Sequence, residues 1–462
     1  MQKVFDEVGS LDKRCYLQFG LTEDILMEHA ANSINIFIRE KYPLNSKLLI
    51  ACGVGNNGAD GIALARLLYS DYDVELFLPF GVKSDMGKLQ LQRVKLLALD
   101  ISEELSEDNF DLVVDCLFGS GLNRKLSDKY KNLIEKLNNL DGYKLSCDIP
   151  SGILYDGTLS DEVFVSDTTI TMGALKSSLF GDNVKDFVGE IRVANLGLSR
   201  DIYESSSNTF LLEKSDLKLP IRDKQLTHKG TFGHLAVIKG HKEGASILSA
   251  SVAIPFGVGL VSCVSGEKIA NLPYSIMQSN ILPKNTTAIA IGMGLGKNYD
   301  KSMLENKIPK VLDADIFYDE VILEQLEKEN IVLTPHPKEF CSLLSLCGIA
   351  SIDIDTLQKD RFKYLKLFCK KYPKVVLLLK GANVLISKDD KVYINTYGSS
   401  ILSFGGSGDI LSGLIGSLLA QGYSSLDAAI SGTLAHTLAA SNYTYSNYSL
   451  TPEGLIEEIK KL

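Results

Sequence analysis

A glycine-rich segment in the C-terminal half of the chain is the clearest candidate for chemistry. Gly405–Asp409 (GGSGD) directly precedes an apolar stretch, Ile410–Ala420, that is expected to be a helix. Backbone N–H groups at such a helix start form a nest for a phosphoryl group in transfer. The helix dipole also favours an ionised Asp409, so we expect this carboxylate to act as a base. A glycine-rich loop in which Asp409 only starts the helix is the alternative.

Other polar segments of this half follow predicted strands. Lys380–Val384 (KGANV) ends an apolar strand, where its lysine and backbone are suited to nucleotide phosphates. His336 lies at the same sheet edge, although a lone histidine there is more often structural. Gly292–Gly296 (GMGLG) has no Lys-Ser/Thr after its last glycine, so it is not a Walker A loop. We expect it to approach a substrate closely, with a simple turn as the alternative. The DAD segment at 313–315 fits either site carboxylates or a helix cap.

The first half contains a glycine turn with unusual polar content. Gly53–Gly58 (GVGNNG) fits the GxGxxG pattern, which brings backbone N–H groups to a phosphate at a helix start. Alone, this pattern is weak evidence for an ordinary dinucleotide site. The next predicted strand has no acid at its end to hold a ribose, and the turn carries Asn56, Asn57 and Asp60. These side-chain oxygens indicate ion coordination or direct chemistry.

Two aspartates end later strands of the same half. Asp115 leads into Gly119–Arg124, and Asp148 leads into Ile149–Gly152. Ligands of open α/β folds bind at the carboxyl edge of the parallel strands. Either aspartate alone also fits a turn or helix cap. Three polar segments at one edge are better explained by a ligand.

The elements that must position these residues form two series of alternating strands and helices, the pattern of parallel α/β sheets. Strands are predicted at Leu48–Cys52, Val74–Leu78, Leu112–Cys116, Tyr143–Cys147, Thr168–Met172, Leu235–Lys239, Leu260–Val264, Ala288–Ile291, Lys310–Leu312, Ile331–Leu333 and Val375–Leu379. Helices are predicted at Gly61–Tyr69, Lys88–Leu99, Tyr130–Leu137, Asp409–Ala420 and Leu426–Ser441. A polar stretch after Leu198 places a boundary near residues 205–215. We therefore expect two doubly wound α/β domains, residues 1–208 and 209–462.

Composition limits the class of protein. A chain of 462 residues exceeds what one hydrophobic core normally holds. Its net charge of −9 argues against nucleic acid or an anionic membrane as a partner. No apolar run approaches the roughly 18 residues of a membrane span, and the start lacks a signal-like core. Eight cysteines contain no CxxC pair and six histidines no HExxH. We expect a cytoplasmic protein without a zinc site.

The motifs of the first half resemble the NAD(P)H-hydrate epimerase family, which is Rossmann-like. They are Gly55–Gly61 (GNNGADG), Asp115–Leu122 (DCLFGSGL) and Asp148–Gly152 (DIPSG), within a resemblance that covers residues 1–205. The resemblance implies substrate contacts by Asn56, Asn57, Gly58, Ala59, Asp60, Gly119, Ser120, Gly121, Leu122, Asn123, Arg124, Lys125 and Asp148. It also implies a potassium ion held by Asn57, Asp115 and Ser151, and oxygen ligands suit this cation. Ala59 departs from the family's usual glycine.

The second half resembles the ADP-dependent NAD(P)H-hydrate dehydratase family, a branch of the ribokinase-like fold. The resemblance begins near His228 and implies Asp409 as a base that also touches substrate. It implies further substrate contacts by Ala245, Gly294 and His336, and nucleotide contacts by Lys380, Gly381, Ala382, Asn383, Val384 and Gly408. ADP is the implied co-substrate, with Mg²⁺. The sequence departs from this family at two places, the charged segment Lys239–Glu243 and Lys338 in place of glycine, and both bear on the details of substrate contact.

Together the two resemblances imply repair of hydrated NADH and NADPH. The first domain would interconvert the R and S hydrates, and the second would dehydrate the S form at the expense of ADP, giving NAD(P)H, AMP and phosphate. A ribokinase-like small-molecule kinase fused to a nucleotide-binding domain is one alternative, and a non-catalytic nucleotide sensor is another. A homo-oligomer is expected, although the sequence does not define its size. Also open are the preference between NADH and NADPH hydrates, the use of ADP or ATP, and the residue that moves the epimerase proton.

Overall fold

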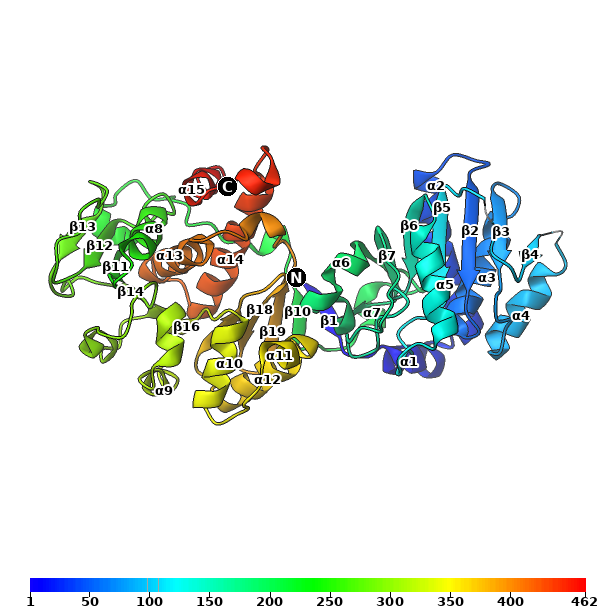
Figure 1. Ribbon diagram of the computed structural model, residues 1–462, viewed down its shortest axis with the longest axis horizontal. Helices are drawn as coiled ribbons and strands as arrows, with labels where there is room; N and C mark the ends of the chain where they lie inside the picture. The colour runs from blue at the N-terminus through cyan, green and yellow to red at the C-terminus, as the bar shows by residue number, and fades with distance from the viewer. Residues whose placement is uncertain (98, 107) are drawn as a thin grey trace. The chain divides into compact units, whose positions relative to one another are not determined.

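The computed structural model describes residues 1–97, 99–106 and 108–462 and divides the chain into two compact units. One unit comprises Lys3–Ser207, and the other comprises Asn208–Leu462 with Met1 and Gln2. Each unit has its own sheet and its own apolar core (Figure 1). Within the described ranges, no helix is both long and apolar enough to cross a membrane.

The N-terminal unit is built on a parallel sheet of order β4-β3-β2-β5-β6-β7-β9. Its strands are β2 (Lys47–Cys52), β3 (Asp73–Phe77), β4 (Ile101–Ser102), β5 (Leu112–Cys116), β6 (Tyr143–Cys147), β7 (Thr168–Met172) and β9 (Glu190–Ala194). The chain runs outward from β2 to β4 and then resumes at β5 on the other side of β2. This reversal creates a topological switch point between β2 and β5, where open α/β sheets bind ligands.

Helices cover both faces of this sheet because successive strand residues point to opposite sides. Leu48 and Ile50 pack with residues of α2 and α3, whereas Leu49 and Val113 pack with residues of α5. The helices are α1 (Gly9–Phe19), α2 (Glu23–Lys41), α3 (Asn56–Leu68), α4 (Asp85–Val94), α5 (Asp128–Asn139), α6 (Lys185–Val188) and α7 (Arg200–Tyr203). A short parallel pair, β1 (Gln2–Phe5) and β8 (Leu175–Lys176), joins the start of the unit to the segment after β7.

The C-terminal unit has a mixed sheet of order β13-β12-β11-β14-β15-β16-β17-β18-β19-β10. Its strands are β10 (Thr209–Leu211), β11 (His234–Ile238), β12 (Leu260–Val264), β13 (Met277–Ser279), β14 (Ala288–Ile291), β15 (Lys310–Leu312), β16 (Ile331–Leu333), β17 (Val376–Leu379), β18 (Val384–Lys388) and β19 (Lys391–Asn395). Pairings from β13 to β17 are parallel, whereas β18 pairs antiparallel with both β17 and β19. Residues 380–383 form the turn between β17 and β18.

The helices of this unit also form two layers. They are α8 (Glu243–Ala253), α9 (Ile322–Gln325), α10 (Pro337–Leu346), α11 (Ile354–Lys359), α12 (Arg361–Lys371), α13 (Ser407–Ala420), α14 (Ser425–Ser441) and α15 (Pro452–Ile459). Figure 1 shows α13 between α8 and α14, and these helices share one core with residues such as Leu378 of β17. Leu377 and Leu379 point to the opposite face and are also buried, so the strand is covered on both sides.

The predicted fold class, two doubly wound α/β domains, is confirmed. All eleven predicted strands are present, with ends that differ by no more than one residue. The helix limits were less accurate: α3 begins at Asn56 instead of Gly61, because its glycine-rich first turn is itself helical. The helix predicted to end at Leu99 ends at Val94, and Ala98 of that prediction lies outside the described residues.

Candidate active sites

The first candidate site is a cavity of about 430 Å³ at the carboxyl ends of β2, β5 and β6. Its lining includes eight residues of the predicted substrate set: Asn56, Asn57, Asp60, Gly119, Ser120, Gly121, Leu122 and Asp148. Of the others, Gly58 and Ala59 are buried behind the turn, and Asn123 lines a neighbouring cavity. Arg124 and Lys125 are exposed, and Lys125 lies 3.3 Å from Asp161. The structure therefore brings together most of the predicted set.

The glycine turn is shaped by close backbone packing. A Cβ atom on Gly58 would lie 1.9 Å from the Gly53 carbonyl oxygen, so only glycine fits there. A Cβ atom on Gly119 would lie 2.7 Å from Asp148 Oδ2 and 3.1 Å from Asn57 Oδ1. The loop after β5 can therefore approach both polar side chains because it carries a glycine at this position.

Asp148 is a fixed carboxylate at the centre of this site. Its φ is +70°, and its Oδ2 accepts from the Ser120 backbone N–H at 2.8 Å. Its Oδ1 accepts from the Met172 N–H at 3.2 Å and from Lys176 Nζ at 2.7 Å. Burial by itself would raise the pKa of Asp148, but Lys176 and the backbone donors outweigh burial and lower it. Lys176 was not identified from the sequence. Its only signal there is that a lysine follows the apolar residues Ala174 and Leu175.

Two other carboxyl groups line the same cavity in different surroundings. No hydrogen bond reaches the Asp60 carboxyl group from the described part of the chain, and burial, with the nearby Asp148 charge, raises its pKa well above the ordinary value. Asp12 of α1 accepts from the Tyr203 hydroxyl at 2.8 Å, and burial raises its pKa too. Asp12 lies outside every motif, so its position in the cavity could not be predicted from the sequence.

Asp115 and Ser151 lie together beneath the cavity. The Ser151 hydroxyl donates to Asp115 Oδ1 at 2.6 Å, and the Ser151 N–H donates to Oδ2 at 2.8 Å. Burial raises the pKa of Asp115 to about 6, against these hydrogen bonds. Buried Asn57 Nδ2 has no hydrogen-bond partner among the described residues, and Asn57 Oδ1 faces Gly119. A carboxylate, a hydroxyl and an amide oxygen are thus supplied from three separate segments.

The second candidate site lies at the N-terminus of α13. Gly406, with φ +100°, turns the chain into the helix, and Asp409 lies in the first turn. Burial, and then the neighbouring Asp313, raise the pKa of Asp409 to about 6, against the charges of Lys380 and Lys242. Burial thus shifts the pKa of Asp409 in the direction opposite to the one that the helix dipole favours.

Lys380 links this helix start to the neighbouring strands. Its Nζ lies 2.8 Å from Asp313 Oδ1, and the Ser412 hydroxyl donates to Asp313 Oδ2 at 2.7 Å. Burial lowers the pKa of Lys380, but the carboxylates of Asp313, Glu339 and Asp409 outweigh burial and raise it. A Cβ atom on Gly408 would lie 3.4 Å from Lys380 Nζ. Asp313, which the sequence left open, thus anchors the lysine with its side chain.

The predicted substrate contacts lie on the loops around this helix start. Gly294 has φ +58°, and a Cβ atom there would lie 3.3 Å from the Ala245 Cβ, so these two residues are neighbours. His336 begins α10, where its Nδ1 accepts from the Glu339 N–H at 3.2 Å. The structural role that the sequence offered as the alternative for His336 is therefore present, while its half-exposed ring stays accessible.

Arg361 supports the predicted nucleotide segment, which contains Lys380, Gly381, Ala382, Asn383 and Val384. Only 2% of Arg361 is exposed, and its guanidinium donates to the carbonyl oxygens of Leu379, Lys380 and Asn383 at 2.9–3.2 Å. A buried guanidinium with several donors fixes the shape of a loop. Arg361 was not identified from the sequence because it lies in α12, outside the Lys380–Val384 motif.

Fold and sites together define a class of protein: a two-domain α/β protein with a separate polar site at the carboxyl edge of each sheet. The family profile described as YjeF-related protein N-terminus matches residues 23–178, and the NAD(P)H-hydrate dehydratase profile matches residues 235–461. The bifunctional NAD(P)H-hydrate repair enzyme Nnr of Helicobacter pylori is 44% identical over 473 aligned positions that cover 100% of both chains. The chain therefore belongs to the family of bifunctional NAD(P)H-hydrate repair enzymes.

Other relatives extend this comparison. The bifunctional NAD(P)H-hydrate repair enzyme Nnr of Escherichia coli is 31% identical, with 94% of this chain and 88% of that one aligned. Among solved structures, the ADP/ATP-dependent NAD(P)H-hydrate dehydratase from Bacillus subtilis, co-crystallised with ATP/Mg²⁺, is 23% identical with a TM-score of 0.46. It covers 55% of this chain and 98% of its own. Both resemblances seen in the sequence are confirmed by the family match, which does not favour the kinase alternative.

Proposed function

We propose that the N-terminal unit interconverts the R and S hydrates of NADH and NADPH, and that the C-terminal unit dehydrates the S form with ADP as phosphoryl donor. The observation that carries this proposal is the presence of two different polar sites on one chain, each at the carboxyl edge of its own sheet. Similarity along nearly the whole chain to proteins named bifunctional NAD(P)H-hydrate repair enzymes supports it.

In the first site, Asp148 and Asp60 would act on the hydrated ring as a matched pair. Asp148 is held ionised by Lys176, whereas the raised pKa of Asp60 keeps that carboxyl group available as a proton donor. Two carboxyl groups whose surroundings push their pKa values apart are suited to opposite roles in acid–base chemistry. Asp60 would donate a proton to the C6 hydroxyl, so that the C6–O bond breaks and water leaves while the ring nitrogen supplies the electron pair. Water would then add to the opposite face of C6 and return its proton to Asp60, while Asp148 orients the ring.

A potassium ion fits the oxygens of Asn57, Asp115 and Ser151, because hard cations prefer oxygen ligands. When bound, it would supply positive charge next to the negatively charged dinucleotide. Magnesium has no equivalent cluster: within the described ranges, no group of three or more His, Cys, Asp and Glu could hold a metal ion. Mg²⁺ would therefore come with the nucleotide phosphates, which commonly supply its ligands.

In the second site, Asp409 would remove the proton from the C6 hydroxyl of the S hydrate. The oxygen would then attack the β-phosphorus of ADP, and the bond from that phosphorus to the bridging oxygen would break, releasing AMP. The glycine-rich nest of α13 and Lys380 would stabilise the transferred group through charge and position. Cleavage of the C6–O bond releases phosphate, and loss of a proton from C5 restores the reduced nicotinamide.

The test of this proposal is the recovery of absorbance at 340 nm from hydrated NADH and NADPH. A mixture of R and S hydrates is incubated with the intact protein and ADP, with ATP in a parallel reaction and no nucleotide in a third. We expect complete conversion to the reduced cofactor with ADP, with AMP and phosphate formed in equal amounts. Absence of recovery with both nucleotides would contradict the proposed function.

A further inference from the structure

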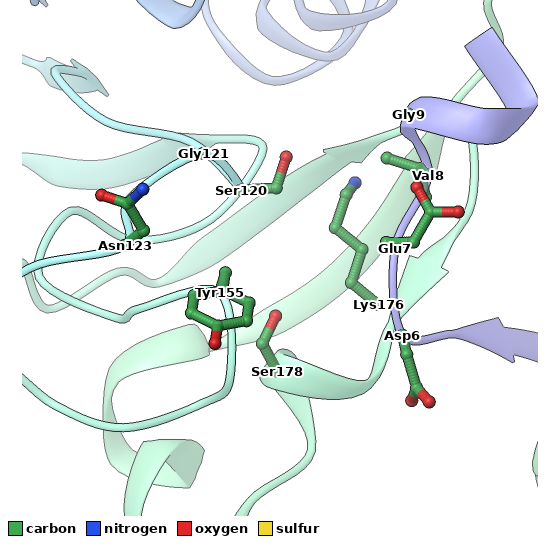
Figure 2. Close-up of a pocket in the computed structure, with 10 residues that line it drawn as sticks. All are labelled: Asp6, Glu7, Val8, Gly9, Ser120, Gly121, Asn123, Tyr155, Lys176 and Ser178. Atoms are coloured by element: carbon green, nitrogen blue, oxygen red, sulfur yellow. The ribbon is translucent and has the colours of Figure 1, made fainter. Parts of the chain in front are cut away.

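A second cavity of about 600 Å³ lies beside the first site in the N-terminal unit. Figure 2 shows Tyr155 and Ser178 along one wall of this second cavity, and Glu7 on the segment that leads into α1. Ser120 and Asn123, from the loop after β5, also line it. This loop therefore presents residues to both cavities.

The two cavities share part of their lining. Ser120, Gly121 and Val8 line both of them. The first cavity contains Asp60 and Asp148, where the hydrated nicotinamide ring would bind under the proposed function. A dinucleotide has a second nucleotide half on the other side of its pyrophosphate, and the second cavity adjoins the first at these shared residues.

The lining of the second cavity suits a neutral nucleoside. The Tyr155 ring is open to solvent, with 55% of the residue exposed, and exposed aromatic rings are common stacking platforms for bases. Ser178 and Asn123 offer groups that hydrogen-bond to hydroxyls or a base edge. Among the described residues that line this cavity, Lys176 is the one cation, and its ammonium group already contacts Asp148, Thr171 and the Met172 carbonyl.

The second cavity carries negative charge, which favours a ribose with a free 2′-hydroxyl over one with a 2′-phosphate. Asp6 and Glu7 both line it, and hydrogen bonds from the Ser10 hydroxyl and N–H lower the pKa of Glu7, so it stays ionised. A carboxylate can accept from a ribose hydroxyl, as the acidic residue of a dinucleotide fold does, but it repels a 2′-phosphate.

From these observations we propose that the second cavity binds the adenosine half of the hydrated dinucleotide, with Tyr155 beneath the adenine and the carboxylate wall selecting the unphosphorylated ribose. The proposal rests on the proposed epimerase function of the neighbouring cavity. It adds the part of the substrate that lies away from the reacting ring and the residues that distinguish NADH hydrate from NADPH hydrate.

The first experiment compares dinucleotide and mononucleotide hydrates. The intact protein, without ADP so that dehydration is silent, receives the R hydrate of NADH or of reduced nicotinamide mononucleotide, and chromatography separates the epimers. We expect Tyr155→Ala to raise KM for NADH hydrate about tenfold, as loss of one base stack does, with no change for the mononucleotide. Tyr155→Phe should keep the wild-type KM. Tyr448→Ala, at a tyrosine that is 87% exposed in the other unit, is the control.

The second experiment tests the carboxylate wall. Glu7→Gln removes the charge and keeps a hydrogen-bonding group for the start of α1. We expect kcat/KM for NADPH hydrate to rise about three- to fivefold relative to NADH hydrate, since one exposed charge pair has a small effect. Glu135→Gln, an exposed glutamate of α5 outside both cavities, should leave this ratio unchanged.

The outcomes separate the two proposals. Wild-type protein that epimerises neither NADH hydrate nor the mononucleotide hydrate would contradict the proposed function itself. Wild-type protein that has the same KM for NADH hydrate and for the mononucleotide hydrate would overturn only the adenosine assignment. Equal effects of Tyr155→Ala on the two substrates, or an unchanged NADPH-to-NADH ratio in Glu7→Gln, would also overturn that assignment.

Discussion

Asp409 and Asp148 are both enclosed aspartates at the carboxyl edge of a sheet, yet their surroundings shift their pKa values in opposite directions. Burial dominates at Asp409 and raises its pKa to about 6. At Asp148, Lys176 and two backbone N–H donors outweigh burial, and the pKa falls. A carboxylate with a pKa near neutral is an effective general base, whereas one fixed by several donors is better suited to orientation.

The first prediction concerns Asp409. Asp409→Asn keeps the size of the side chain but removes the base, so dehydration of the S hydrate should fall by roughly 10²–10⁴-fold. Because the ionised form is the active one, the wild-type rate should rise with pH through about 6. A pH profile of the 340-nm assay measures both effects, and ADP binding by calorimetry should persist. Wild-type turnover in the variant would remove Asp409 from the mechanism.

The second prediction concerns the buried pair of Lys176 and Asp148. Lys176→Met leaves a buried carboxylate without its counter-charge, which should lower the free energy of unfolding by roughly 3–5 kcal/mol near neutral pH. The pKa of Asp148 should then rise, so protonation at lower pH should reduce the loss. Urea unfolding at several pH values measures this loss. Lys176→Arg should restore part of the stability, and Lys88→Met, at an exposed lysine of α4, should change little.

Between single residues and whole domains, short backbone segments determine the shape of both sites. Gly58, in the first turn of α3, packs against the backbone of Gly53. Arg361 donates hydrogen bonds to the carbonyl groups around the end of β17. In each case, a residue with no direct role in chemistry fixes the position of those that have one.

The third prediction compares two glycines of the same turn. Gly58→Ala would place a Cβ atom 1.9 Å from the Gly53 carbonyl oxygen, so the turn must shift and epimerase activity should be largely lost. At Gly55 no atom lies within 4 Å of the added Cβ, and φ is −98°. Gly55→Ala should therefore retain the melting temperature of the wild type. Similar melting temperatures and activities for the two variants would contradict this account of the turn.

The fourth prediction concerns Arg361. Arg361→Met removes the donors to three carbonyl groups, and a lost hydrogen bond to a charged group costs about 1.5–3 kcal/mol. The Lys380–Val384 segment should lose its fixed shape, so KM for ADP should rise more than kcat falls. Steady-state kinetics with ADP varied measure this split. A fall in kcat alone would show that Arg361 does not act through the nucleotide segment.

At the scale of the whole molecule, two different activities on one chain imply a sequence of reactions. The first unit would supply the S hydrate that the second consumes, so a mixture of the R and S epimers should be repaired completely. Sites that share no residues are expected to respond independently to substitution.

The fifth prediction tests this relay with Asp148→Ala. When both hydrates and excess ADP are supplied, the S fraction should be repaired at the normal rate, and the R fraction should lag behind at the uncatalysed rate of epimerisation. The 340-nm trace should therefore become biphasic, whereas the wild type gives one continuous phase. An unchanged trace would exclude the first unit as the epimerase, and a slowing of both phases would show that the two activities are coupled.

The sequence by itself determined the fold class, the strands and the family. Buried parallel strands are short apolar runs, and the motifs that follow them are local, so both can be identified from neighbouring residues. Asn57 and Asp60 were identified in this way, because they lie within one turn. The domain limits and the individual roles of the site residues remain predictions.

Only the tertiary structure revealed the residues that act across elements. Lys176 reaches Asp148 from 28 positions away, Arg361 supports a segment that begins 19 positions later, and Asp12 enters the first cavity from a helix without a motif. The pKa of Asp409 likewise depends on burial, which a local sequence does not contain. Contacts and burial of this kind arise when distant segments pack together, and no spacing along the chain encodes them.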